Sequence, residues 1–217
     1  MRKTIHALAL ALAVATTLPA ALLAGEILPS EVHWVSVEEI GESLSGRTPI
    51  SVGFDIDDTL LFSSPCFYHG KQKYSPGSDA YLHDMRFWQE TNGGCDRYSL
   101  PKEVGRRLIE LHQARGDRIF FITGRPSTPG EKLSEILQQT FAIKAMNPVI
   151  FSSGPEKAAF IRQQGIALYY GDSDSDIRSA RDAGIRGVRV MRAASSTNQP
   201  LPENGALGEE VIIDSDH

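Results

Sequence analysis

From residue 49 onward, short apolar runs alternate with segments of helical character, and this alternation limits the possible folds more than any other feature. Runs rich in β-branched and aromatic residues predict strands at residues 49–54, 118–122, 149–151, 167–170 and 187–191. Helical periodicity with Gly or Pro at the ends predicts helices at residues 101–115, 129–139, 155–164 and 174–183. Strands that alternate with helices predict a parallel α/β sheet that carries helices on both faces.

Further segments complete a single domain over residues 25–217. A capping box that starts at Ser36 predicts a short helix at residues 36–44. The apolar stretch at residues 210–213 predicts a strand, which we expect at the edge of the sheet. Residues 63–99 are rich in aromatic residues, Gly, Pro and Ser, and we interpret them as a small inserted cap of loops and short helices over the strand ends.

The first 24 residues have the pattern of a secretory signal peptide. A basic start is followed by an apolar run at residues 7–15 and by small residues that end at Ala24. Cleavage after Ala20 or Ala24 would release the protein into the periplasm with no membrane attachment. The alternative is an uncleaved anchor, but the apolar run is short for a bilayer span.

Charge and cysteine content narrow the possible partners. The formal net charge is −5, so the chain has no general attraction for nucleic-acid backbones or anionic lipid. A small anionic substrate would need locally arranged positive groups. In an exported protein Cys66 and Cys95 can form a disulfide, but their spacing does not decide between a disulfide and two free thiols. No histidine has a spacing that would complete a zinc site with them.

Polar residues follow four of the predicted strands, at the point where each strand ends. They are Asp55 and Asp57 after the first strand, Thr123, Gly124 and Arg125 after the second, Lys157 after the third, and Asp172 and Asp176 after the fourth. Because parallel strands place their carboxyl ends at one edge of a sheet, we expect these side chains to gather there. Crowded carboxylates need a cation or a catalytic task, so we expect a carboxylate nucleophile, an acid/base partner and a metal.

Two long motifs carry a family resemblance. The stretches FDIDDTLLFSSP at residues 54–65 and YGDSDSDI at residues 170–177 resemble motifs of the haloacid-dehalogenase-like (HAD) superfamily, and most closely those of the class B bacterial acid phosphatases. HWVSV at residues 33–37 and NPVIF at residues 147–151 also resemble that family. The resemblance implies a Rossmann-like fold and an exported, magnesium-dependent, homotetrameric phosphatase that hydrolyses small organic phosphate monoesters.

The roles of the two central acids follow from the needs of phosphate ester cleavage. Asp55 would be the nucleophile and would form an aspartyl phosphate. Asp57 would protonate the leaving alcohol and then activate water, and an alcohol in place of water would give phosphotransfer. The ordinary alternative for this pair is a turn or helix cap. Lys157 and the metal would keep the pKa of Asp55 low.

The metal is expected to be Mg²⁺, which prefers oxygen ligands. Asp55 and Asp172 are its predicted side-chain ligands, and the resemblance adds the backbone carbonyl of Asp57. Asp176 is expected to orient the metal or its water without binding it. Asp174 is interpreted as a helix cap.

The phosphoryl group would be held by Thr123, the Gly124 amide and Lys157. A strand-end threonine and a solvated helix lysine are the plainer interpretations of two of these residues. For Arg125, a phosphate contact and a surface ion pair remain equally open.

The cap carries residues for the leaving group. Phe67, Tyr81, Leu82 and Trp88 match positions at which the family lines an apolar pocket, and aromatic rings favour nucleotide bases and aryl groups by stacking. Ordinary packing or a subunit interface explains them equally well. Asn198 departs from the family, whose close relatives have an aromatic residue at this position.

Two rival functions use similar residues. A signalling receiver domain would need an acceptor Asp after its third strand, where this chain has Phe151-Ser152-Ser153. A non-catalytic exported protein that binds phosphate or a metal would not need the proton donor Asp57. Turnover of a chromogenic phosphate ester separates these functions from the predicted phosphatase.

Overall fold

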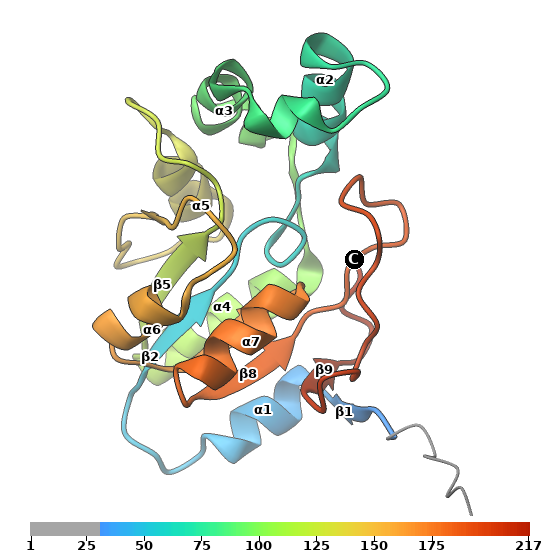
Figure 1. Cartoon of the computed structure of the whole chain (residues 1–217). Helices are drawn as coiled ribbons and strands as arrows, with labels where there is room; N and C mark the ends of the chain where they lie inside the picture. The colour runs from blue at the N-terminus through green and yellow to red at the C-terminus, as the bar shows by residue number, and fades with distance from the viewer. Residues whose placement is uncertain (1–30) are drawn as a thin grey trace, which may run out of the picture.

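A computed structural model describes residues 31–217, so the predicted signal peptide lies outside the described residues (Figure 1). The described residues form a seven-stranded sheet in the order β1-β9-β8-β7-β2-β5-β6, in which neighbouring strands are parallel. The strands are β1 (His33–Val35), β2 (Ser51–Phe54), β5 (Arg118–Thr123), β6 (Ile150–Phe151), β7 (Ile166–Gly171), β8 (Arg186–Arg189) and β9 (Glu210–Ile212). The predicted parallel α/β fold is confirmed.

Helices cover both faces of this sheet, as predicted. They are α1 (Val37–Ser43), α4 (Glu103–Arg115), α5 (Leu133–Thr140), α6 (Ala158–Gln163) and α7 (Asp174–Asp182). Figure 1 shows α6 and α7 in front of the strands and α4 behind them. Alternate residues of the strands supply the two layers, because successive side chains of a strand point to opposite faces. Phe54 and Phe121 pack toward α4, whereas Phe120 and Ile122 pack toward α6 and α7.

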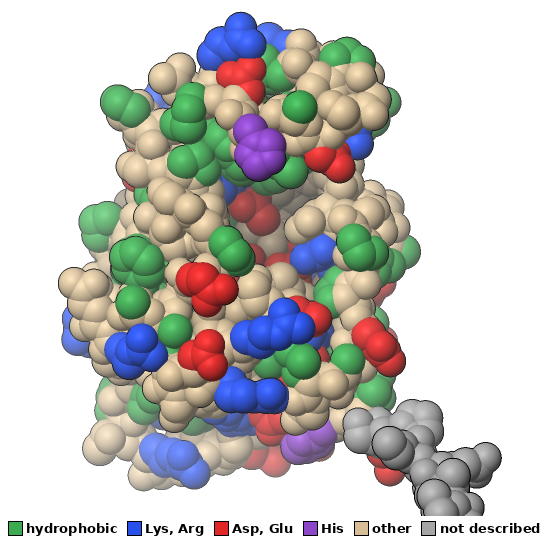
Figure 2. Space-filling model, viewed as in Figure 1, with side chains coloured by type: hydrophobic (Ala, Val, Ile, Leu, Met, Phe, Trp, Pro, Cys, Tyr) green, Lys and Arg blue, Asp and Glu red, His purple; other side chains and the backbone are tan. Residues whose placement is uncertain are grey.

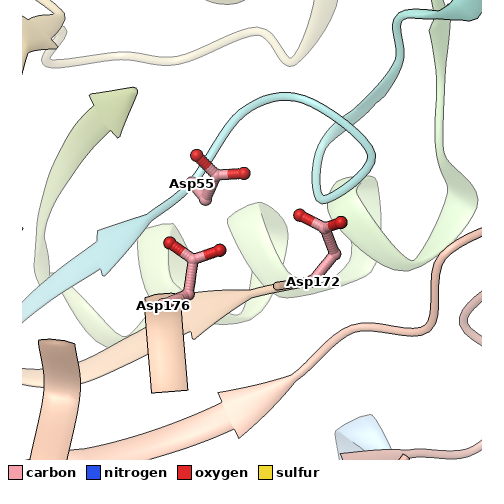
Figure 3. Close-up of side chains that lie close together, drawn as sticks. All are labelled: Asp55, Asp172 and Asp176. Carbon is pink, nitrogen blue, oxygen red and sulfur yellow. The ribbon is translucent and has the colours of Figure 1, made fainter. Parts of the chain in front are cut away.

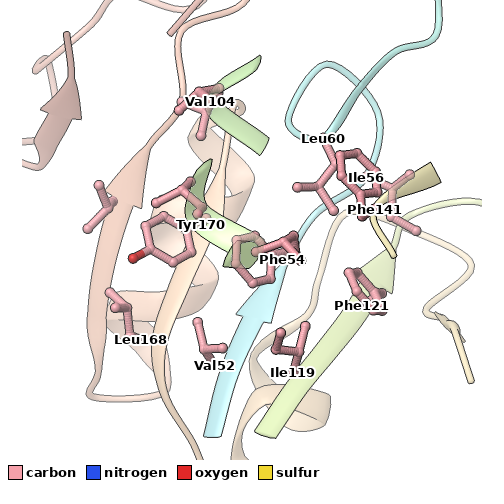
Figure 4. Close-up of a cluster of buried hydrophobic side chains, with 14 of the residues drawn as sticks. Val52, Phe54, Ile56, Leu60, Val104, Ile119, Phe121, Phe141, Leu168 and Tyr170 are labelled. Atoms are coloured by element: carbon pink, nitrogen blue, oxygen red, sulfur yellow. The ribbon is translucent and has the colours of Figure 1, made fainter. Parts of the chain in front are cut away.

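The larger core lies between the sheet and helices α1, α4 and α5 (Figure 4). Phe54 at the end of β2 stacks on Tyr170 of β7, with ring centroids 4.8 Å apart, and it also lies beside Phe121 of β5. Each of these three aromatic side chains is fully buried. The end of the central strand is therefore rigidly held on both sides.

Most element boundaries lie within two residues of those that the local signals predicted. Ser36 Oγ accepts from the Glu39 amide at 3.1 Å, and the Glu39 carboxylate accepts from the Ser36 amide at 2.7 Å, so the predicted capping box is present. Gly116 ends α4 with φ +75°, a conformation that favours glycine. Helix α5 begins at Leu133, four residues later than predicted.

The predicted position of the last strand is wrong. Strand β9 is an interior strand, because β1 pairs with it on its outer side with His33 opposite Glu210. Residues 33–35 were not predicted to form a strand. Strand order depends on contacts across the fold, and the local pattern at residues 210–213 carries no information about it.

Residues 63–99, which we call the cap, stand above the edge of the sheet (Figure 1). They contain α2 (Ser64–Tyr74), α3 (Met85–Asn92) and two 3₁₀ helices, η1 (Ala80–His83) and η2 (Cys95–Tyr98). A short antiparallel pair, β3 (Leu61–Phe62) with β4 (Leu100–Pro101), joins the cap to the sheet domain. Cys66 and Cys95 form a disulfide within the cap. Within residues 31–217, no helix combines the length and the apolar character needed to cross a bilayer.

Candidate active site

The carboxyl ends of β2 and β7 bring three carboxylates together (Figure 3). Asp55 directly follows β2, and its amide donates to the Tyr170 carbonyl at 2.8 Å, which extends the strand pairing by one residue. Asp172 directly follows β7, and Asp176 lies in the first turn of α7. One oxygen of each carboxylate lies within 4.8 Å of the others, and all three residues are buried.

Lys157 lies among these carboxylates. Its Nζ donates to Asp55 Oδ1 at 2.5 Å and to Asp176 Oδ1 at 2.7 Å. The lysine stands just before α6, and its backbone amide donates to Ser179 Oγ of α7 at 3.1 Å. Only 3% of the residue is exposed, so the interpretation as a solvated lysine is wrong.

The cluster carries more negative charge than Lys157 can balance. Burial raises the pKa of Asp55, the Lys157 ammonium lowers it, and the carboxylates of Asp176 and Asp172 raise it again, so that it stands well above its ordinary value. Burial also raises the pKa of Asp172, although the Arg192 guanidinium opposes this. Lys157 alone therefore does not keep the pKa of Asp55 low, and the expected lowering would require the bound metal as well.

These residues fit a hard divalent cation. Three carboxylates face one another with oxygen donors only, which is the donor set that Mg²⁺ prefers. Thr59 Oγ1 lies 3.2 Å from Asp55 Oδ2 and 3.1 Å from Asp172 Oδ1, so its single proton is available to either carboxylate. Asp176 is held by the capping box of α7, in which its Oδ2 accepts from the Ser173 amide at 3.2 Å, and the same oxygen accepts from the Ser173 hydroxyl at 2.6 Å.

The carboxylate of Asp57 points away from this cluster and toward Arg125. It accepts two hydrogen bonds from the guanidinium, from Nε at 2.8 Å and from Nη2 at 2.6 Å. Burial raises the pKa of Asp57, but the Arg125 guanidinium outweighs burial, and the pKa falls below its ordinary value. Arg125 is 2% exposed, so the alternative of a surface ion pair is wrong.

Two predicted phosphate-binding residues lie at the end of β5. Gly124 lines the cavity described below, and a Cβ atom there would lie 3.2 Å from the Gly154 carbonyl oxygen, so glycine permits a close approach of the two backbones. Thr123 is buried, and its Oγ1 accepts from the Arg125 amide at 3.3 Å. Its side chain is not among those that line the cavity.

A cavity of about 340 Å³ opens between the cap and the edge of the sheet, and Figure 2 shows acidic side chains at its base. Asp55, Asp57, Lys157, Asp172 and Asp176 line its inner part. The four residues predicted to line an apolar pocket, Phe67, Tyr81, Leu82 and Trp88, form its cap-side wall. Reactive and apolar groups thus face the same space.

A loop after β8 forms the remaining wall, and the sequence reasoning missed most of it. Thr197, Asn198 and Gln199 line the cavity. Arg192 Nε donates to Asp172 Oδ2 at 2.6 Å, and its Nη1 donates to the Asn198 carbonyl at 2.7 Å. Strand β8 also ends at this edge of the sheet, so the rule that located the other site residues could have located Arg192.

The interpretation of Asp174 as a helix cap is wrong. Ser173 is the N-cap of α7, and its Oγ accepts from the Asp176 amide at 3.2 Å. Asp174 occupies the first position of the helix and accepts from Arg189 at 2.9 Å. A serine immediately before an acidic turn was the signal for this cap.

Comparison with known proteins agrees with this geometry. The family model of HAD superfamily subfamily IIIB (acid phosphatase) matches residues 31–199. The class B acid phosphatase of Salmonella typhimurium is 54% identical over 192 residues, which cover 86% of this chain and 81% of that protein. The Haemophilus parainfluenzae class B acid phosphatase is 52% identical over 86% of this chain and 82% of its own.

A solved structure supports the fold. A candidate beta-phosphoglucomutase from Bacteroides vulgatus aligns over 83% of this chain and 92% of its own, with a TM-score of 0.52 and 15% identity. At that identity the similarity concerns the fold alone. The family match, in contrast, extends over most of the chain and includes the strand-end acids. The chain therefore belongs to the acid phosphatases of HAD subfamily IIIB.

Proposed function

We propose that this phosphatase is an exported, Mg²⁺-dependent enzyme that hydrolyses small organic phosphate monoesters through a phosphoaspartate. The observation that carries the proposal is that Asp55, Lys157 and Asp57 face one cavity, with two further carboxylates beside Asp55. Binding of phosphate or of a metal alone would not need the carboxylate of Asp57, which pairs with Arg125 outside the carboxylate cluster.

The first half-reaction transfers the phosphoryl group to the protein. A carboxylate oxygen of Asp55 attacks phosphorus, and the bond from phosphorus to the ester oxygen breaks. Asp57 gives its proton to the leaving oxygen, which departs as an alcohol. The ion pair with Arg125 favours the ionised form of Asp57, and a phosphate dianion near Arg125 would compete for the guanidinium and so favour the protonated form.

The second half-reaction releases phosphate. Asp57, now ionised, takes a proton from water as the water oxygen attacks phosphorus, and the bond from Asp55 to phosphorus breaks. An alcohol that reaches the same position would accept the phosphoryl group instead, which is the basis for phosphotransfer.

Positive groups and backbone amides would stabilise the transferring phosphoryl group. Lys157 already contacts Asp55, and the Gly124 amide lies at the cavity wall. Thr123, buried behind that wall, would support it. Asp55, Asp172 and the backbone carbonyl of Asp57 would hold Mg²⁺, with Asp176 orienting it. When bound, the ion would supply positive charge to the phosphoryl oxygens and to the nucleophile.

The apolar wall suggests aryl esters and nucleotides as substrates. Phe67 and Trp88 meet edge to face with ring centroids 5.8 Å apart, and both belong to the cap's own small core. Leu82 is 36% exposed and reaches the cavity. A ring of the leaving group would find apolar surface here while its phosphate lies near Asp55.

Export and assembly are also part of the proposal. A disulfide is typical of proteins in oxidising compartments, which agrees with periplasmic localisation after signal cleavage. The acidic net charge argues against nucleic-acid polymers and anionic membranes as partners. A homotetramer remains an expectation from the resemblance.

Removal of the divalent cation tests the function itself. We expect exhaustive chelation to lower kcat for p-nitrophenyl phosphate by at least about 100-fold, because several kcal/mol of charge stabilisation would be lost. Added Mg²⁺ should restore activity and raise the melting temperature, since a ligand that binds the folded state stabilises it. Unchanged turnover after chelation would rule out the metal, and no turnover with Mg²⁺ would rule out the function.

The apolar wall makes a separate prediction. Leu82→Ser should raise KM for p-nitrophenyl phosphate about tenfold, because apolar contact with the aryl group is lost. KM for glycerol 2-phosphate should change little. Met85→Ser is the matched control, since Met85 is an exposed cap residue that does not line the cavity. Equal KM changes for both esters would show that Leu82 does not contact the leaving group.

A further inference from the structure

One guanidinium connects the cap to the predicted acid/base residue. Arg125 donates two hydrogen bonds to Asp57 on one side, as described above. On the other side it donates to Asp96 of η2, from Nη1 at 2.6 Å and from Nη2 at 3.0 Å. Asn92 of α3 accepts a further bond from Nη1 at 3.2 Å. Arg125 is therefore shared between two carboxylates, and one of them belongs to the cap.

The cap side of this arrangement is firmly built. Asp96 is 1% exposed, and its Oδ1 also accepts from Ser99 Oγ at 3.1 Å. Asn92 is fully buried and donates to the Pro126 carbonyl at 3.0 Å, just after Arg125 in the chain. The guanidinium also lies 5.7 Å from the centre of the Phe67 ring. These hydrogen bonds offset the cost of burying the Asp96 carboxylate, so removal of one partner would leave a buried charge poorly compensated.

The disulfide restrains the same segment. Cys95 directly precedes Asp96, and it is bonded to Cys66 of α2, 29 residues earlier. The link ties η2 to α2 and so restricts how far the Asp96 backbone can move from Arg125. It also ties η2 close to Phe67, which follows Cys66 in the chain.

We propose that Asp96, anchored by the Cys66–Cys95 disulfide, is a positioning residue that acts through Arg125 on Asp57. This inference rests on the proposed function. An arginine side chain has several rotatable bonds, and two carboxylates at adjacent edges of its planar group hold it in one orientation. With Asp96 in place, Arg125 presents two fixed donors to Asp57, and the Asp57 carboxylate is held at the cavity where a leaving oxygen would lie. Without Asp96, the guanidinium loses two hydrogen bonds and keeps those to Asp57 and Asn92, so its orientation and that of Asp57 are less restricted.

A positioning role predicts a dependence on the leaving group. p-Nitrophenolate departs readily without a proton, whereas the alkoxide of glycerol 2-phosphate needs one from Asp57. We expect Asp96→Asn, which keeps the shape and removes the charge, to lower kcat/KM for glycerol 2-phosphate by about 30-fold. The loss for p-nitrophenyl phosphate should be less than about fivefold. A merely structural role would lower both values equally.

Two comparisons isolate the pathway. In an Arg125→Lys background, Asp96→Asn should have no further leaving-group-selective effect, because its route to Asp57 is already interrupted. Glu90→Gln removes a cap carboxylate that contacts Lys73, Tyr74 and His69 and has no contact with Arg125, and both esters should be cleaved at wild-type rates. Melting curves would establish that each variant is folded.

A second variant keeps the test decisive if Asp96→Asn does not fold. Cys66→Ala with Cys95→Ala leaves every side chain of the Arg125 network in place, and we expect a selective loss for glycerol 2-phosphate of about threefold to tenfold. If Asp96→Asn lowers kcat/KM equally for the two esters, the inference is overturned. If Asp96→Asn does not fold, an equal fall for the two esters in the cysteine variant would overturn it. Failure of the wild-type protein to cleave either ester would instead overturn the proposed function.

Discussion

Asp55→Asn is expected to abolish phosphatase turnover while the protein remains folded. The amide has no anionic oxygen with which to attack phosphorus, so no phosphoaspartate can form. Loss of a covalent nucleophile typically costs several orders of magnitude, and we expect kcat to fall by at least about 10⁴-fold. The measurement is steady-state hydrolysis of p-nitrophenyl phosphate with saturating Mg²⁺.

The fold should tolerate this change for a physical reason. Asp55 is buried with Asp172 and Asp176, and burial together with the neighbouring carboxylates raises its pKa, so removal of one charge relieves repulsion. The same change removes a partner of Lys157, which keeps its contact with Asp176. The melting temperature should therefore stay close to that of the wild-type protein, although activity is lost.

A matched variant and a direct assay complete this test. Asp174→Asn changes an acid of the same region whose carboxylate pairs with Arg189 and Arg178, and it should retain wild-type kcat. Acid quenching during turnover of a ³²P-labelled ester should leave label on the wild-type protein and none on Asp55→Asn. Mass spectrometry should show that the introduced amide has not been hydrolysed back to the acid. If the intact variant then keeps more than about a tenth of wild-type kcat, Asp55 is not the nucleophile.

The strand-end rule located the inner part of the site from sequence. In the sequence, Asp55 lies more than 100 residues before both Lys157 and Asp172. The three residues nevertheless meet, because each follows a strand of one parallel sheet. Apolar runs identify such strands, and a parallel arrangement then leaves little freedom for the residues just after each strand. Lys157 lies at this edge of the sheet, as predicted, and contacts Asp55 there.

The outer part of the site required contacts that no local pattern encodes. Asp96 lies in a short 3₁₀ helix with no periodic signal, and its partner Arg125 is 29 positions away on another element. The pairing exists only because the cap folds back over the end of β5. The order of β1 and β9 escaped sequence reasoning for the same reason, since it depends on pairing across the fold and not on either segment alone.

Lys157→Met is expected to lower both the stability and the activity of the protein. The substitution keeps the length of the apolar stem and removes the ammonium from its place between Asp55 and Asp176. Breaking a buried pair by removing one partner typically costs about 3–5 kcal/mol, and we expect the free energy of unfolding in a chelating buffer to fall by this amount. We expect kcat with Mg²⁺ to fall at least about 100-fold, because the phosphoryl group loses a cation.

The pH dependence of this loss has a definite sign. The pKa of Asp55 is already raised by burial and by its neighbours, and without Lys157 it would rise further. A carboxyl whose folded pKa exceeds its unfolded value destabilises the protein at high pH, and protonation relieves the penalty as the pH falls through the folded pKa. Urea unfolding should therefore show a larger loss for Lys157→Met at pH 7 than at pH 5.

Mg²⁺ should partly replace the missing ammonium, because both cations balance the same carboxylates. In urea unfolding the Lys157→Met variant should gain more stability from Mg²⁺ than the wild-type protein does. Lys71→Met is the control, since its exposed ion pair with Asp79 should be worth less than about 1 kcal/mol with or without the ion. Equal stabilisation of wild type and Lys157→Met by Mg²⁺ would mean that the lysine and the ion do not share these carboxylates, and the metal site would then have to lie elsewhere.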